Sequence, residues 1–260
     1  MTAVIAEPAR PGQKARHSAF GNLVRTEATL LAREVVPLLW GVGFPVVLLS
    51  IFGVFSHGPD KSLGGFSLVA SYTPVLIAFT ISTFGLQGLP TVLAGYRERG
   101  ILRRLNATPV GAGRLLAVQL TVNLAVALVA TLGILVVGYA AFGVAFPKQP
   151  VGFLLALLLT TAAMLTLGLL IASLARTPRV AGAVGTMLFL PLMFFAGLWM
   201  PQAVMPAALR RVGDDTPLGA AVSALQHSMA GQWPQLSDLA ILAAYALAFG
   251  LIAWRFFRWE

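Results

Sequence analysis

Long stretches without aspartate, glutamate, lysine or arginine constrain this chain more than any other feature of its sequence. A helix that crosses a bilayer needs about 20 consecutive apolar residues. Five of the stretches exceed that length, and the sixth is extended by an aromatic belt between Trp254 and Trp259. The six uncharged stretches are residues 35–59, 62–96, 115–147, 149–175, 180–209 and 239–254.

These stretches favour helices over the strands of a β-barrel. Barrel strands alternate apolar and polar residues over about 10 positions, and runs such as LLALLLTTAAMLTLGLLIASLA show no such alternation. With 58% hydrophobic and 10% charged residues, the composition also departs from that of a soluble domain. The sequence therefore predicts an all-α integral membrane protein with six transmembrane helices.

The distribution of basic residues predicts the orientation of the chain. If the N-terminus lies in the cytosol, only 4 of the 18 lysines and arginines fall outside, namely Lys61, Lys148, Arg210 and Arg211. Because positive charge marks cytoplasmic loops, both termini are expected in the cytosol. The net charge of +9 then needs no nucleic-acid partner. Residues 1–16 lack an apolar core and are expected to be a disordered cytoplasmic tail, not a signal peptide.

Motifs for metal, nucleotide or hydrolytic chemistry are missing from the sequence. It contains no cysteine, and His17, His57 and His227 form no cluster by their spacing. Neither the phosphate-binding motif G-x-x-x-x-G-K-[ST] nor the hydrolase motif G-x-S-x-G occurs. We therefore expect no catalytic residue, no metal and no cofactor in this chain, and expect any ATP to be hydrolysed by another polypeptide.

Residues 17–35 predict a helix of a different kind, ahead of the first span. Apolar residues recur there at steps of three and four, from Phe20 to Val35, while charged residues fall largely on other faces. This pattern favours a helix that lies in the membrane interface. A cytoplasmic extension of the first span is the alternative.

The segment GYRERGILRRLNATPV, residues 95–110, places four arginines and a glutamate between the second and third spans. Its Ile101, Leu102 and Leu105 share one helical face, and Pro109 should end the helix. A positive-inside anchor is the simpler interpretation. An ordered apolar face flanked by arginine, however, is typical of a surface that binds a protein partner.

This segment resembles the cytoplasmic segment of ABC-2 type ABC-transporter permeases, whose pattern is approximately E-R-E-x-G-T-L-x-x-L-x-x-T-P. Seven residues match, and Tyr96 and Ile101 stand where the pattern has an acid and a threonine. Residues 200–229 are similar to the external helical hairpin of the same family, and the chain looks most like its drug-resistance and antibiotic-export branch. The matching residues are Arg97, Glu98, Gly100, Leu102, Leu105, Thr108 and Pro109.

The resemblance implies a homodimer of permeases that works with two copies of a separate ABC ATPase subunit, which binds ATP and Mg. Residues 96–108 would insert into the ATPase as a coupling helix, and the external hairpin would be re-entrant and cap the exit. The coupling residues implied are Arg97, Glu98, Arg99, Gly100, Leu102, Arg103 and Leu105.

We accordingly expect one transmembrane domain over residues 17–260, after the tail at 1–16. Its predicted parts are the interfacial helix 17–35, the coupling helix 95–109, the external helices 201–234, and spans at 36–56, 68–93, 114–142, 151–175, 179–199 and 237–257.

Bulky aromatic side chains and a few polar ones within the spans suggest a pathway for hydrophobic or amphipathic cargo across a bacterial plasma membrane. Such residues also commonly face lipid or a neighbouring helix. Polysaccharide or lipid-linked cargo is an alternative, and so is an ion-gradient-driven transporter, although none of the nine acids falls in mid-span. The candidate pathway residues are Phe44, Phe79, Thr83, Gln87, Phe189, Phe194 and Trp199.

Overall fold

The computed structural model describes residues 13–56, 58–60, 63, 65–101, 104 and 112–256. Six of its helices are long and apolar enough to cross a membrane, so the prediction of an all-α membrane protein with six spans is confirmed. The spans are Val35–Val54, Leu68–Glu98, Gly113–Phe142, Pro150–Leu174, Pro178–Ala196 and Leu236–Phe256.

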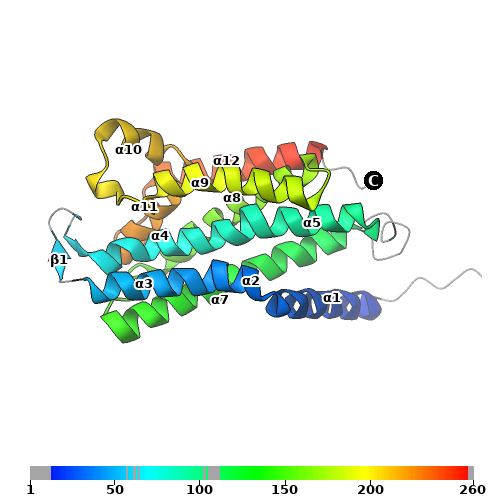
Figure 1. Cartoon of the computed structure of the whole chain (residues 1–260), viewed down its shortest axis with the longest axis horizontal. Coiled ribbons are helices and arrows are strands. Elements are labelled where there is room, and N and C mark those ends of the chain that lie inside the picture. Colours follow the sequence, from blue (N-terminus) through cyan, green and yellow to red (C-terminus); the bar gives the residue numbers. More distant parts are fainter. Residues whose placement is uncertain are drawn as a thin grey trace, which may run out of the picture.

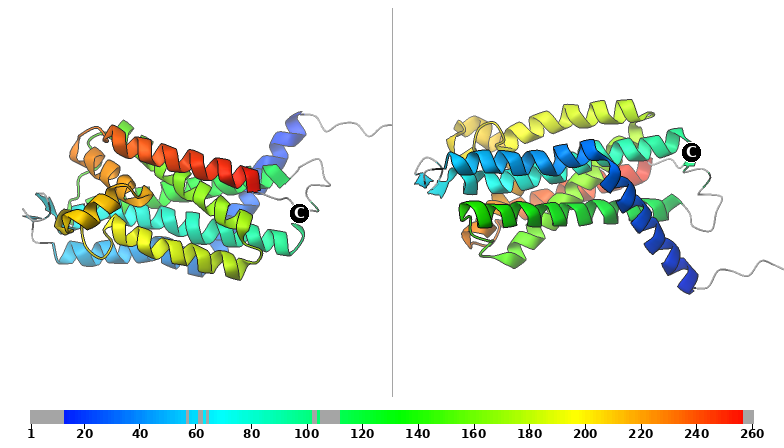
Figure 2. Two further views of the ribbon diagram at one scale, coloured as in Figure 1. Left: turned by 90° about the horizontal axis from the view of Figure 1, so that it is seen from above. Right: turned by 60° about the horizontal axis from the view of Figure 1, so that its bottom comes forward.

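The spans lie side by side along the long axis of the molecule (Figure 1). One end carries the short antiparallel strands β1 (Pro59–Asp60) and β2 (Phe66–Ser67) together with α10 (Ala207–Asp214), and we call it the hairpin end. The other end carries α1 (Gln13–Arg33) and the last turn of α12 (Leu236–Phe256), and we call it the terminal end. Figure 2 shows α1 running at an angle to the bundle and past its terminal end.

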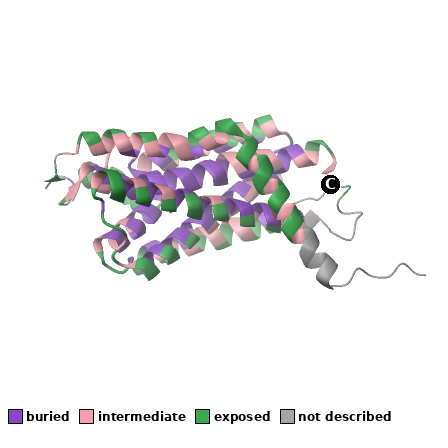
Figure 3. Cartoon of the chain, turned by 90° about the horizontal axis from the view of Figure 1, so that it is seen from below, coloured by how far each residue is buried: buried purple, intermediate pink, exposed green. Residues whose placement is uncertain are grey.

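The second span is the central helix of the bundle. It consists of α4 (Leu68–Ser82), the π-helix η3 (Thr83–Gly88) and α5 (Leu89–Glu98). In its most apolar window 78% of residues are buried, against 17% for the first span. Figure 3 shows buried residues on the inner helices and helix faces and exposed residues on the outer faces of the bundle. Several buried hydroxyl groups inside this span donate to carbonyl oxygens one turn earlier, as Thr80 does to Leu76 at 3.1 Å, so the helix itself supplies their acceptors.

Each of the two described π-helical segments ends two residues before a proline. The first span is built from α2 (Val35–Leu38), the π-helix η1 (Leu39–Gly43) and α3 (Phe44–Val54), with Pro45 in the first turn of α3. In the central helix, η3 is followed by Pro90 in the first turn of α5. Proline lacks an N–H and its ring crowds the carbonyl of the preceding turn, so a widened turn is a natural way to accommodate it.

Glycines let η3 approach its neighbours closely. Gly168 lies on α8 (Pro150–Leu174), and a Cβ there would overlap the carbonyl oxygen of Gly85. Gly185 lies on α9 (Pro178–Ala196), and a Cβ there would overlap the carbonyl oxygen of Leu86. The backbone of η3 is therefore held between two helices at a distance that only glycine permits.

The chain between the fifth and sixth spans folds back against the hairpin end. It forms the 3₁₀ turn η4 (Gln202–Val204), α10 and α11 (Pro217–Ala230). The apolar stripe of α11, from Leu218 to Met229, is buried against the spans, and its N-terminus is capped by the Thr216 hydroxyl, which accepts from Gly219 N at 3.1 Å. The third span, α7 (Ala112–Phe142), completes the bundle.

Candidate functional site

The arginine-rich segment begins as the last turn of α5 and then changes direction. Helix α5 ends at Glu98, the N–H of Gly100 donates to Arg97 O at 2.9 Å, and Gly100 has a φ of +68°. A left-handed glycine after the last helical residue ends a helix. The predicted single helix over 95–109 is therefore wrong in its first part, because residues 95–98 belong to α5. Beyond the turn, Ile101 is helical and the N–H of Arg104 donates to Gly100 O at 3.1 Å.

The structure gives the predicted coupling residues different environments. Glu98 and Arg99 are exposed at the terminal end, where a partner protein has access to them. Arg97 is half-buried, and its Nη1 donates to the carbonyl oxygens of Ala172 at 2.8 Å and Ala175 at 3.1 Å. These carbonyls lie at the C-terminal end of α8, where helices have acceptors without intrahelical donors. Arg97 therefore fastens α5 to α8. Leu102, Arg103 and Leu105 lie outside the described residues.

Glu27 of α1 joins three helices, a role that was not predicted from the sequence. The hydroxyl of Tyr96 on α5 donates to both carboxylate oxygens of Glu27 at 2.8 Å. The amide of Gln119 on α7 donates to Oε2 at 2.7 Å. Glu27 lies at the border of the apolar stripe of α1, three residues after Val24 and four before Leu31, and this spacing was the signal available in the sequence.

A cavity of about 370 Å³ lies beside this carboxylate. Its walls come from α1, α2, η3, α5, α7 and the start of α9, and they combine apolar side chains with the charged residues Glu27, Glu34 and Arg99. No group of three metal-ligating side chains occurs among the residues that the structure describes. The cavity therefore has the size and mixed lining of a site for a small organic molecule.

Three of the seven predicted pathway residues come together. The ring of Phe79 lies 5.2 Å from the rings of both Phe44 and Phe189, joining the first, second and fifth spans. Trp40 stacks on Phe44 at 4.8 Å and extends this aromatic cluster to the surface, where half of its side chain is exposed. The cluster is defined here as Trp40, Phe44, Phe79 and Phe189.

The other four pathway candidates do not join the aromatic cluster. The hydroxyl of Thr83 donates to Phe79 O at 2.9 Å, within its own helix. Gln87 is half-buried in η3, and Phe194 packs edge-on against its neighbour Phe195 at 5.5 Å. Trp199 lies beyond the end of α9 and is 55% exposed.

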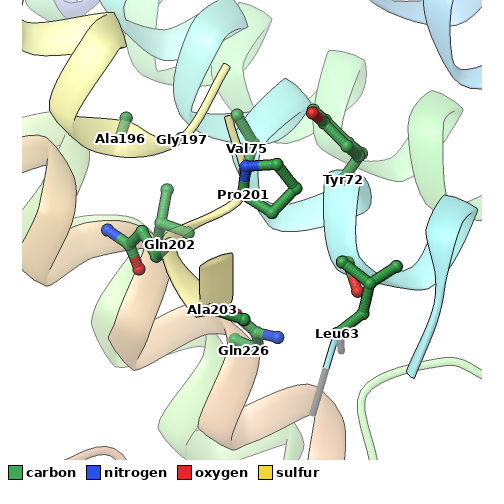
Figure 4. Close-up of a pocket in the computed structure, with 11 residues that line it drawn as sticks. Leu63, Tyr72, Val75, Ala196, Gly197, Pro201, Gln202, Ala203 and Gln226 are labelled. Atoms are coloured by element: carbon green, nitrogen blue, oxygen red, sulfur yellow. The ribbon is translucent and has the colours of Figure 1, made fainter. Parts of the chain in front are cut away.

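A second, smaller cavity lies at the hairpin end (Figure 4). Tyr72 of α4 and Gln226 of α11 line it, together with Gln202 of η4, whose amide donates to Phe195 O at 3.2 Å. Its volume of 20 Å³ has room for about one water molecule. This cavity is thus too small for an organic substrate.

The family comparison covers most of the chain. The model of the ABC-2 type transporter family matches residues 18–230, from α1 to the end of α11. The comparison with curated proteins finds no match. The matched family is the membrane, or permease, part of ABC transporters, which is distinct from the ATPase and works with one. With the family model covering α1, five spans and the helices at the hairpin end, the chain belongs to the ABC-2 type transporter family and is a multi-pass transmembrane subunit of an ABC transporter.

Proposed function

We propose that this chain is the permease of an exporter that moves hydrophobic or amphipathic, drug-like compounds across the bacterial plasma membrane. Two copies of the chain pair as a homodimer, and two copies of a separate ABC ATPase bind ATP with Mg and hydrolyse it. The terminal end faces the cytoplasm and the hairpin end faces outward.

The observation that carries this proposal is the path of the central helix. Glu98 and Arg99 are exposed at the terminal end, and the same span runs from them without a gap to η3, which is buried between α8 and α9. A force applied at Glu98 by an ATPase is therefore delivered to the middle of the bundle. Arg97 carries part of the same force into α8 through its two bonds to backbone carbonyls.

The orientation is supported by the charges at the two ends. Among the described residues beyond α1, the hairpin end carries Lys148, Arg210 and Arg211. The terminal end is richer in basic residues, as expected of a cytoplasmic face. Its members are Arg97, Arg99, Arg104, Arg114, Arg176, Arg179 and Arg255.

The cargo class is supported by the aromatic cluster, which joins three spans and reaches the surface at Trp40. Aromatic faces bind apolar and amphipathic molecules with little conformational cost. The first and fifth spans both take part in the cluster, and both keep outward-facing apolar residues such as Val47 and Met187 that a second copy can cover. We place the pathway between the two copies, beside this cluster.

The test is ATPase activity of the chain reconstituted in vesicles with the ABC ATPase encoded beside its gene. Glu98→Arg reverses an exposed charge at the end of α5, and we expect it to abolish complex formation or the stimulation of ATP hydrolysis by cargo. Asp215→Arg makes the same charge change at the exposed hairpin end and is the matched control. Full coupling in Glu98→Arg would show that the segment is only a topological anchor, and would favour a gradient-driven transporter.

A further inference from the structure

The cavity at the terminal end is a candidate site distinct from the aromatic cluster. Helix α1 packs along α7 and is joined to α5 mainly through Glu27, so the cavity occupies the space between α1 and α5, with α7 as its floor. Figure 2 shows α1 diverging from the bundle at this place. Its volume of 370 Å³ lies within the range of about 300–1,000 Å³ that is usual for small-molecule sites.

The lining is made of two sets of residues, one polar and one apolar. Glu27, Tyr96, Gln119 and Asn123 contribute polar groups, with Glu34 and Arg99 as the further charged residues. The remaining wall is formed by aliphatic and aromatic side chains. These are Leu30, Leu31, Phe84, Leu89, Val92 and Val122. A molecule that fills this cavity is therefore amphipathic.

The charge of the polar lining residues depends mainly on Glu27. Among the described residues, its carboxylate accepts hydrogen bonds from the neutral groups of Tyr96 and Gln119. Within the described part of the chain, neither Glu27 nor Glu34 has a lysine or arginine partner at salt-bridge distance. A carboxylate that is held by two neutral donors still has acceptor capacity for a further donor. The two acids outnumber Arg99, so the cavity favours a cation.

We propose that this cavity binds an amphipathic molecule with an ammonium group. The ammonium lies against the carboxylates of Glu27 and Glu34, and the apolar part packs against Leu31, Phe84 and Val92. Two sources share this chemistry. One is a membrane lipid with an ammonium headgroup, taken from the leaflet in which α1 lies, and the other is a soluble cationic amphiphile that enters from the terminal end.

The binding test uses the full-length permease in a nonionic maltoside detergent, without an ATPase, and follows the fluorescence of added ethidium. We expect saturable binding to the native protein, and at least about tenfold weaker binding to the double variant Glu27→Gln plus Glu34→Gln, because its charge contacts are lost. Glutamine at 27 keeps an acceptor for Tyr96, which limits the structural damage. Asp215→Asn makes the same kind of charge change at the other end and should bind as the native protein does.

A second variant tests binding in the cavity without changing Glu27 or Glu34. Val92→Phe fills part of the cavity while leaving the contacts of Glu27 in place, and it should also weaken ethidium binding. Unchanged binding in both variants would overturn the proposal, as would saturable binding of an anionic dye that is lost in Arg99→Gln. Competition by added phosphatidylethanolamine but not by phosphatidylglycerol would identify the lipid source, and no competition by either would identify the soluble one. Because no ATPase is present, failure here leaves the proposed coupling through Glu98 untouched.

Discussion

An alanine at Gly185 tests how closely the central helix is held. Its Cβ would overlap the carbonyl oxygen of Leu86 and lie 3.1 Å from the carbonyl carbon. Both atoms belong to backbone, so they cannot turn aside as a side chain does, and α9 and η3 must move apart. Overpacking of this kind costs about 1–3 kcal/mol of the free energy of unfolding.

Gly133 on α7 provides the matched control, because a Cβ there meets no atom within 4 Å. Alanine at that position removes a flexible residue from a helix interior and should be neutral or stabilising by up to about 1 kcal/mol. Both glycines lie inside helices and share this gain, so the two variants are expected to differ by the cost of overpacking, about 1–3 kcal/mol. Reversible unfolding by sodium dodecyl sulfate, followed through tryptophan fluorescence, measures the free energy of unfolding of each.

Equal stabilities for Gly185→Ala and Gly133→Ala would refute the close approach of α9 to η3. A further check is the double variant Gly168→Ala plus Gly185→Ala. Both residues contact adjacent carbonyls of η3, so once one alanine has displaced that backbone the second should cost less than its single-variant value. If the cost of the double variant equals the sum of the two single costs, the backbone of η3 is displaced independently by α8 and by α9.

Three further variants test single contacts. Tyr96→Phe removes the donor to Glu27 and should lower the free energy of unfolding by about 1.5–3 kcal/mol in the same assay, since the acceptor is charged. Thr177→Ala removes the cap that accepts from Val180 N at 3.3 Å and should cost about 1 kcal/mol. Burial raises the pKa of Asp214, so its contribution to stability is present below the ordinary carboxyl range and is lost as pH rises through the raised value. Asp214→Asn should therefore flatten the fall in stability with rising pH, and an unchanged pH profile would contradict this.

The six spans followed from the sequence because hydrophobic length is a property of each segment by itself. The uncharged stretch 149–175 contains α8 almost residue for residue, and the stretch 62–96 contains most of the central helix. Nothing beyond length and apolarity was needed, since the bilayer requires both of any spanning helix. Gly100 could also have indicated the end of α5, since glycine commonly follows the last residue of a helix. A continuous helix over 95–109 was expected instead.

The contacts of the candidate site were beyond the sequence because they join distant segments. Glu27 meets Gln119 across 92 positions, and Arg97 meets Ala175 across 78. Periodicity assigns each residue to a face of its own helix but does not name the neighbouring helix. The aromatic cluster was partly predictable, since three of its four members were among the seven pathway candidates, but only packing selected Phe44, Phe79 and Phe189 from them.

Two consecutive residues at the end of α5 form hydrogen bonds to two different helices, and these bonds limit how the end of α5 can move. Tyr96 bonds to α1 through Glu27, and Arg97 bonds to the carbonyls that end α8. A displacement of Glu98 must therefore carry α1 and α8 with it or break charged hydrogen bonds, each worth about 1.5–3 kcal/mol. The same span also contacts α8 closely at η3, through Gly168. Between α1 and α5, in contrast, lies the cavity, and the bond of Tyr96 to Glu27 is the main contact. Separation of α1 from α5 is thus the less costly movement, and it would open the cavity beside Glu27.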